Sequence, residues 1–241
     1  MWQEFALFMT SIAAAMVASI TGFGIGSLIT PLLSVSVGTK LAVALVSIPH
    51  LVATALRFWL LKSHVDRRVL LIFGSMSAIG GLLGAFLYAQ FATPALNLIF
   101  GSILIFAGFM GASGLSEKMR FRGAVALAAG ALSGLLGGMV GNQGGIRSAA
   151  LLGFQISKES FVATATAIGL IVDGVRMPIY IWSEWQGLAA NGKWILLAVV
   201  GVVAGTLLGS KLLKRIEERL FKRIISSVIL ILGVFMLYQG L

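Results

Sequence analysis

Residues 22–57 read GFGIGSLITPLLSVSVGTKLAVALVSIPHLVATALR, an apolar run that opens on spaced glycines and ends on an arginine. The run aligns without a gap on residues 141–176, at an offset of 119, so that Arg57 falls on Arg176. Gly22-Phe-Gly-Ile-Gly26 falls on Gly141-Asn-Gln-Gly-Gly145. Further matches follow a six-residue insertion in the later copy: Gly80 with Gly205, Gly84 with Gly209, and Gly108 with Gly233. The chain is therefore interpreted as two copies of one unit.

Ten apolar segments follow one another along the chain. They cover approximately residues 5–20, 24–36, 40–62, 68–89, 94–113, 123–140, 143–154, 158–181, 193–212 and 218–239. A membrane-spanning helix needs about 20 residues. The first two segments and the sixth and seventh are shorter and are separated only by glycine-rich turns, so they are either re-entrant half-helix hairpins or strongly tilted spans. Because each copy holds five segments, an odd number, the second copy enters the membrane inverted.

The composition supports this all-α polytopic membrane fold with two inverted five-segment repeats. Hydrophobic residues make up 59% of the chain and charged residues 11%, whereas a soluble domain carries roughly a quarter charged residues. Most of the surface must therefore face lipid. The absence of cysteine excludes disulfides, thiolate zinc sites and thiol catalysis. With two histidines and eight acidic residues, we expect no metal site and no cofactor.

The basic residues predict which loops face the cytoplasm. The loops after the third, fifth, seventh and ninth segments carry thirteen of them: Lys62, Arg67, Arg68, Lys118, Arg120, Arg122, Lys158, Lys211, Lys214, Arg215, Arg219, Lys222 and Arg223. The opposite side has only Lys40 and Lys193. We therefore assign the net charge of +10 to cytoplasmic loops and membrane lipids rather than to nucleic acid, and we expect both termini on the non-cytoplasmic side.

The expected organisation is one integrated membrane domain. The first repeat covers residues 1–115, a cytoplasmic linker covers 116–122, and the second repeat covers 123–241. The apolar start of the chain lacks the basic residues of a signal peptide, so residues 5–20 are interpreted as a mature first helix, with a cleaved signal peptide as the alternative.

Three arginines, Arg57, Arg147 and Arg176, lie inside apolar segments and are not explained by sidedness. In the third segment, four polar residues share one helical face: Ser47, His50, Thr54 and Arg57. The matching positions of the eighth segment hold Thr166, Gly169, Asp173 and Arg176. A charge in the bilayer core costs roughly 2.5–3.5 kcal/mol. Arg57 and Arg176 therefore either reach for the membrane surface, or coordinate an anion, and Asp173 can also neutralise Arg176.

The glycine turns are the second candidate feature. Gly22 and Gly24 precede one short helix, and Gly141 and Gly144 open another, whose N-terminal amides would cradle an anion. Asn142 and Gln143 add amide donors, whereas the alternative is close packing of helices through small residues.

Two further residues have open roles. Arg147 is a third anion ligand or a paired structural residue. His50 binds substrate, shuttles a proton or is a plain buried histidine.

The glycine turn that opens a short helix, the Pro31-Leu-Leu33 that follows, the Ala/Ser-rich next helix and the repetition of this block resemble the TauE/SafE sulfite exporter family. The resemblance implies a carrier for sulfite or organosulfonates in the bacterial inner membrane, as a monomer or homodimer. In that family's turns a third adjacent glycine is expected where this chain has Ile25, and the second turn carries Asn142 and Gln143.

The resulting prediction is a secondary transporter, not an enzyme, that exports a small sulfur-containing anion by alternating access at a midplane site between the repeats. Arg57, Arg176, the two turns, Asn142 and Gln143 would line that site. A passive anion channel of the same fold is the alternative. A membrane-embedded enzyme would need an acid–base pair, for which only His50 and Asp173 are candidates.

Overall fold

The computed structural model of the chain describes residues 2–91, 94–115, 121–140 and 143–240. Of the described chain, 91% is helical and no strand occurs within these ranges. The prediction of an all-helical protein is therefore confirmed.

The helices of the first half follow the predicted segments. They are α1 (Trp2–Thr21), α2 (Ile25–Val37), α3 (Thr39–Leu61), α4 (Arg67–Val69), α5 (Ser75–Phe91) and α6 (Pro94–Ala112). A 3-10 turn at Lys62–His64 follows α3, and a π-helical turn at Leu70–Gly74 joins α4 to α5.

The helices of the second half are α7 (Gly123–Val140), α8 (Gln143–Leu151), α9 (Lys158–Ala190), α10 (Gly192–Arg215) and α11 (Glu218–Gly240). Two ends differ from the prediction. Helix α8 stops before residue 154, where Phe121 packs on Gly153: a Cβ added to Gly153 would lie 2.6 Å from the Phe121 ring. Helix α9 runs nine residues past 181, through a break in helical geometry at Glu184 (φ −123°).

Among the described residues, five helices are long and apolar enough to cross a membrane by length and composition: Trp2–Thr21, Leu41–His64, Arg67–Gly84, Gly192–Arg215 and Glu218–Tyr238. Shorter apolar helices cover Ile25–Val37, Gly101–Ala112 and Gly123–Leu135. The chain is thus a multi-pass membrane protein that combines long spans with shorter apolar helices.

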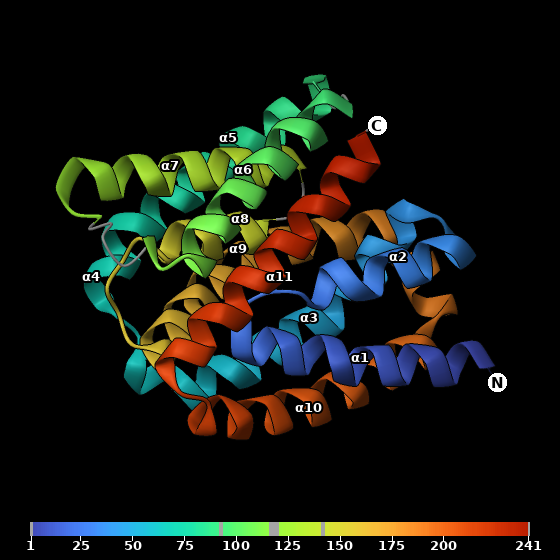
Figure 1. The fold of residues 1–241 in the computed structure, drawn as a ribbon. Helices are drawn as coiled ribbons and strands as arrows, with labels where there is room; N and C mark the ends of the chain where they lie inside the picture. Colours follow the sequence, from blue (N-terminus) through green and yellow to red (C-terminus); the bar gives the residue numbers. More distant parts are fainter. Residues whose placement is uncertain (1, 92–93, 116–120, 141–142, 241) are drawn as a thin grey trace.

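The long helices pack in pairs around a central crossing (Figure 1). Helix α1 lies along α10 on one flank, α5 lies along α7 on the other, and α6 lies along α11. Between the flanks, α3 packs against α9, with α2 on α3 and α8 next to α9. The centre of the molecule is therefore built from one long helix of each half and its short neighbour.

Glycines allow the paired backbones to approach each other closely. A Cβ added to Gly80 would collide with the carbonyl oxygen of Ala131, and one added to Gly205 would collide with that of Ile12. These two contacts involve equivalent positions, because Ala131 follows Ile12 by 119 residues and Gly205 follows Gly80 by 125.

The same equivalence holds where α6 meets α11. A Cβ at Gly108 would lie 2.9 Å from the carbonyl oxygen of Ser226, and one at Gly233 would lie 2.9 Å from that of Gly101. Gly233 follows Gly108 by 125 residues, and Ser226 follows Gly101 by the same offset.

The turns with the basic residues gather at one end of the molecule. The turns after α3, α8 and α10 and the start of α7 all lie on the left of Figure 1. The start of α1, the α2–α3 turn, the α9–α10 turn and the end of α11 lie on the right. We call the left side the basic end.

Candidate functional site

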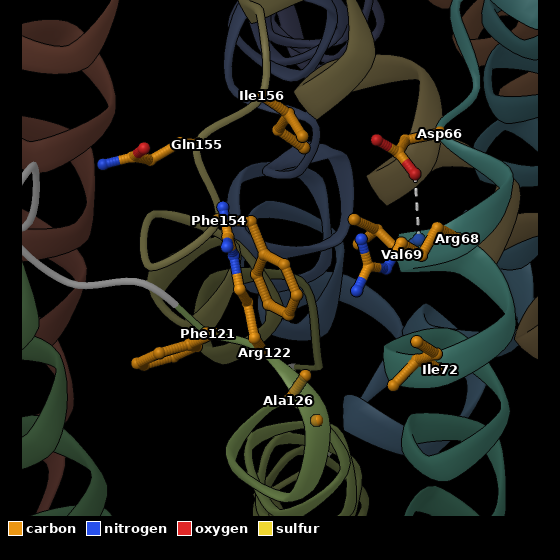
Figure 2. Close-up of a pocket in the computed structure, with 11 residues that line it drawn as sticks. Asp66, Arg68, Val69, Ile72, Phe121, Arg122, Ala126, Phe154, Gln155 and Ile156 are labelled. Carbon is orange, nitrogen blue, oxygen red and sulfur yellow. Dashed lines mark hydrogen bonds between the residues drawn. The ribbon is translucent and has the colours of Figure 1, made fainter.

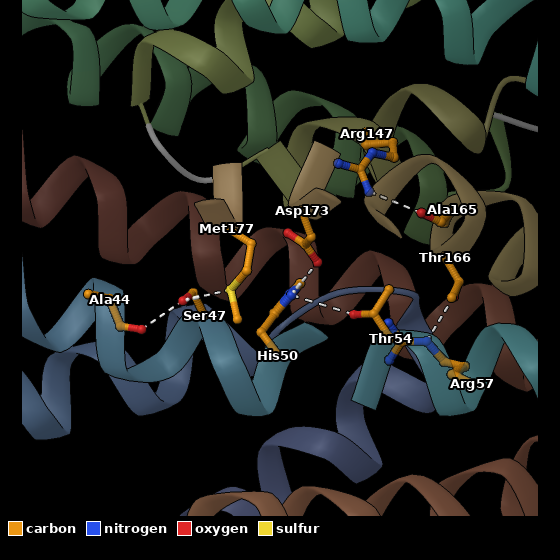
Figure 3. Close-up of polar contacts among 10 residues, drawn as sticks. All are labelled: Ala44, Ser47, His50, Thr54, Arg57, Arg147, Ala165, Thr166, Asp173 and Met177. Atoms are coloured by element: carbon orange, nitrogen blue, oxygen red, sulfur yellow. Dashed lines mark hydrogen bonds and ion pairs between the residues drawn. The ribbon is translucent and has the colours of Figure 1, made fainter. Parts of the chain in front are cut away.

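The predicted polar faces of α3 and α9 meet at the central crossing (Figure 3). Nδ1 of His50 lies 2.7 Å from Oδ2 of Asp173, and the Thr54 hydroxyl lies 3.5 Å from the same nitrogen. On the same face of α3, three residues before His50, the Ser47 hydroxyl contacts the sulfur of Met177 at 3.3 Å. The polar faces predicted from the helix periodicity of the two segments therefore lie against each other where α3 crosses α9.

Arg57 is the largest buried polar residue at the crossing. Its side chain is 2% exposed, and Nε donates a hydrogen bond to the Thr166 hydroxyl at 2.8 Å. Among the described residues none accepts a hydrogen bond from its buried Nη1 atom. The guanidinium is buried against α9 and does not reach solvent at the basic end, so the structure favours an inward-facing Arg57.

Arg147, in the first turns of α8, reaches the same crossing. It is 5% exposed, and Nη1 donates a hydrogen bond to the backbone carbonyl of Ala165 in α9 at 3.0 Å. A Cβ added to Gly169 would lie 3.1 Å from Nη1 of Arg147 and 3.8 Å from Cγ2 of Thr54. The missing side chain of Gly169 therefore leaves the space in which the Arg147 guanidinium approaches α3.

Among the described side chains, the cluster at the crossing holds two cations and one anion. These are Arg57, Arg147 and Asp173, and His50 lies beside the carboxylate. Arg57 interacts favourably with Asp173 and unfavourably with Arg147. His50 and Asp173 are 27% and 20% exposed, whereas both arginines are buried. The cluster is thus accessible at its His50–Asp173 side and closed around the guanidinium groups.

The first glycine turn abuts this cluster. Gly22 and Gly24 have φ angles of 83° and 126°, which glycine adopts without strain, and they reverse the chain between α1 and α2. A Cβ on Gly22 would lie 3.0 Å from Cβ of Ala165, the residue whose carbonyl holds Arg147. The Ser148 hydroxyl of α8 donates to the carbonyl of Thr21 at 3.3 Å.

The two glycine segments meet through Phe23. A Cβ on Gly144 would lie 2.5 Å from Cβ of Phe23, whose side chain is 5% exposed. The phenyl ring also approaches Gly145, at 3.7 Å from its added Cβ. The apolar Phe23 ring therefore lies where the described parts of the two turns meet, and the buried arginines lie beside it, between α3, α8 and α9.

Some of the predicted site falls outside the described part of the chain. Gly141 and Asn142 are outside the described residues. Gln143 begins α8 and Arg176 lies within α9, but their side chains are also outside what the structure describes.

Sequence reasoning missed the contacts that organise the site. Phe23 was quoted only as a spacer between glycines, and the backbone of Ala165 offers no signal in a sequence. The repeat pairs Thr166 with Ser47 on the predicted polar face, and this pairing is the sequence signal that Thr166 belongs to the site.

The chain was compared with protein families, curated proteins and solved structures. Neither the search of curated proteins nor the search of solved structures found a match. The family model for the sulfite exporter TauE/SafE matches residues 7–236, nearly the whole chain. This is a family of transporters, and its description agrees with an apolar, multi-helix membrane protein. The chain belongs to the TauE/SafE sulfite exporter family.

Proposed function

We propose that this chain exports a small sulfur-containing anion, sulfite or an organosulfonate, and binds it at the crossing of α3 and α9. The family supplies the substrate class. The observation that carries the site is Arg57, a buried arginine whose Nη1 atom has no hydrogen-bond partner among the described residues, next to the buried Arg147.

Burial of these groups is costly unless a ligand compensates it. The effective penalty for removing one ion from water is several kcal/mol, and a buried donor without an acceptor costs about 1–3 kcal/mol more. Among the described side chains of the cluster, the Asp173 carboxylate balances one of the two guanidinium groups. An anion beside Arg57 Nη1 would restore neutrality and supply the missing acceptor.

The donors favour an oxyanion over a spherical ion. A guanidinium presents its N–H groups in a planar fork that matches two oxygens of one anion. Sulfite and sulfonates carry three oxygens on one sulfur, so the Arg57 fork can bind two of them and leave the third for a further donor. Thr54, beside His50, offers a hydroxyl.

The packing of the helices supports alternating access by two inverted repeats. The pair α1–α10 corresponds to the pair α7–α5, and the glycine contacts recur at the sequence offsets of 119 and 125. In this proposal the flanks move relative to each other around the α3–α9 crossing and open the cluster first to one side, then to the other.

The short helices fit a re-entrant role. Helix α2 has 13 residues and α8 has 9. At about 1.5 Å per residue these reach roughly 20 Å and 14 Å, less than the ~30 Å of a hydrocarbon core. We propose that both helices begin near the midplane, at the glycine turns beside the cluster.

We assign the basic end to the cytoplasm and both termini to the opposite side. With a negative interior, an anion leaves the cell downhill by ~2.3 kcal/mol per charge per 100 mV. The two halves then form one domain, because every flank pairs a helix of residues 1–115 with one of residues 123–241.

Sulfite flux in proteoliposomes tests the proposal. Purified protein should carry sulfite saturably, and Arg57→Gln should lower the maximal rate at least about tenfold, because a charge-assisted hydrogen bond contributes ~1.5–3 kcal/mol. Arg215→Gln is the matched control, since Arg215 is an exposed arginine at the basic end. Equal flux in wild type and Arg57→Gln would refute the site, and ohmic single-channel currents would identify a passive channel instead.

A further inference from the structure

A pocket of about 160 Å³ opens at the basic end, away from the buried cluster (Figure 2). It lies between α4 with the π-helical turn, the start of α7, and the loop between α8 and α9. Its polar lining comes from Asp66, Arg68, Arg122 and Gln155, and its apolar lining includes Val69, Ala126 and Phe154. The pocket therefore has a charged rim above an apolar floor.

Two arginines reach into this pocket from different elements. Arg68 extends from α4 and Arg122 from the segment before α7 (Figure 2). Both residues are exposed, and within the described ranges neither takes part in a salt bridge. Two like charges that share one small pocket repel each other, so an anion between them would be bound by both.

The carboxylate in the lining does not neutralise the arginines by contact. Oδ1 of Asp66 accepts a hydrogen bond from the backbone N–H of Val69 at 2.9 Å and so caps α4. This places the carboxylate at the helix start, where it compensates the positive end of the helix. Among the described residues, Arg68 and Arg122 are then the cationic groups that line the cavity, and Asp66 is the carboxylate there.

The pocket is separate from the buried cluster but adjoins the same helix. The Phe154 ring in its floor packs edge-on against Phe73, with ring centres 5.6 Å apart, and Phe73 is fully buried. The backbone N–H of Asp66 donates to the Thr164 hydroxyl at 3.0 Å. Thr164 precedes Thr166, the partner of Arg57, by two residues of α9, about 3 Å along the helix axis.

We propose that this pocket is a second anion-binding site, in which Arg68 and Arg122 hold an oxyanion group at the rim. The apolar floor would accommodate a small carbon substituent on that group, as in an organosulfonate. A role of this pocket in loading anions for export rests on the proposed function, whereas anion binding in the pocket does not depend on it. The shared chemistry, an anionic headgroup over apolar contacts, is offered by a dissolved sulfonate and by an anionic lipid.

Binding to the full chain in nanodiscs of zwitterionic lipid tests the proposal, with methanesulfonate as the probe in isothermal titration calorimetry. Wild type should bind the probe, and Arg68→Gln with Arg122→Gln should weaken a binding component at least about tenfold. That component should persist in Arg57→Gln. The matched control, Lys214→Gln with Arg215→Gln, removes two exposed charges of the same end outside the pocket and should bind as wild type does.

Wild-type binding that is unchanged in the Arg68/Arg122 double variant would overturn the proposal, as would absence of binding in wild type. Absence of sulfite flux in wild type, with this binding component still present, would instead count against the export function alone. Nanodiscs with anionic lipid identify the source of the ligand: weaker methanesulfonate binding there assigns the pocket to a lipid headgroup, and unchanged binding assigns it to a dissolved anion.

Discussion

Nε of Arg57 in α3 donates a hydrogen bond to the Thr166 hydroxyl in α9 at 2.8 Å. This contact joins the two halves of the chain through residues 109 positions apart and orients the guanidinium toward the centre. Thr166 follows Ser47 by 119 residues, the offset of the predicted repeat, and the Ser47 hydroxyl contacts the sulfur of Met177 at the same helix crossing.

Replacing Arg57 by methionine should separate stability from function. Arg57→Met removes a buried charge and fills a similar volume, so the substrate-free protein should lose little or no free energy of unfolding. Sulfite flux should fall to background because the anion ligand is lost. Thermal unfolding in detergent and flux in proteoliposomes measure the two effects. A variant that is less stable and still transports would contradict the assignment.

Gly169 should control the position of Arg147. In Gly169→Ala the new Cβ would lie 3.1 Å from Arg147 Nη1, so the guanidinium must shift, and the KM for sulfite should rise several-fold. Gly174→Ala is the matched control on the same helix, since nothing lies within 4 Å of a Cβ added there. Concentration-dependent flux compares the two variants, and equal KM values would show that Arg147 does not touch the substrate.

His50 and Asp173 should be energetically coupled across the crossing. Their 2.7 Å contact predicts an interaction energy of ~0.5–3 kcal/mol in a double-mutant cycle of His50→Gln, Asp173→Asn and the double variant. The free energy of unfolding in detergent is the quantity to compare. Additive single effects would mean that the two side chains do not form a pair in the membrane-embedded protein.

The sidedness of the chain can be mapped with single cysteines, because the natural sequence has none. Ser63 lies in the exposed turn after α3, at the basic end, and Ala190 is exposed at the end of α9. In intact cells an impermeant maleimide should label Ala190→Cys and should leave Ser63→Cys unlabelled until the membrane is opened. The reverse pattern would contradict the assignment of the basic end to the cytoplasm.

The sequence predicts those features that depend on one helix at a time. Hydropathy locates the helices, and the spacing of Ser47, His50, Thr54 and Arg57 places them on one face because an α-helix has 3.6 residues per turn. The pairing of His50 with Asp173 depends on the register between helices 123 residues apart, which no local pattern records.

Two further features were beyond reach of the sequence for the same reason. Phe23 fills the space between two glycine segments that the pattern alone presents as an open cradle, because only the packing of α8 brings Gly144 against it. The final part of α9 carries Trp182, Glu184 and Trp185 and is not uniformly apolar, so hydropathy ends that helix too early.

The most direct test of the anion site is a crystal structure of the full chain with selenite, an oxyanion of the same shape as sulfite whose selenium scatters anomalously. The account predicts an anomalous peak at the crossing of α3 and α9, with selenite oxygens within hydrogen-bonding distance of Nη1 of Arg57 and of the Arg147 guanidinium. Selenite bound elsewhere in the chain, with Nη1 of Arg57 still lacking an acceptor, would contradict it.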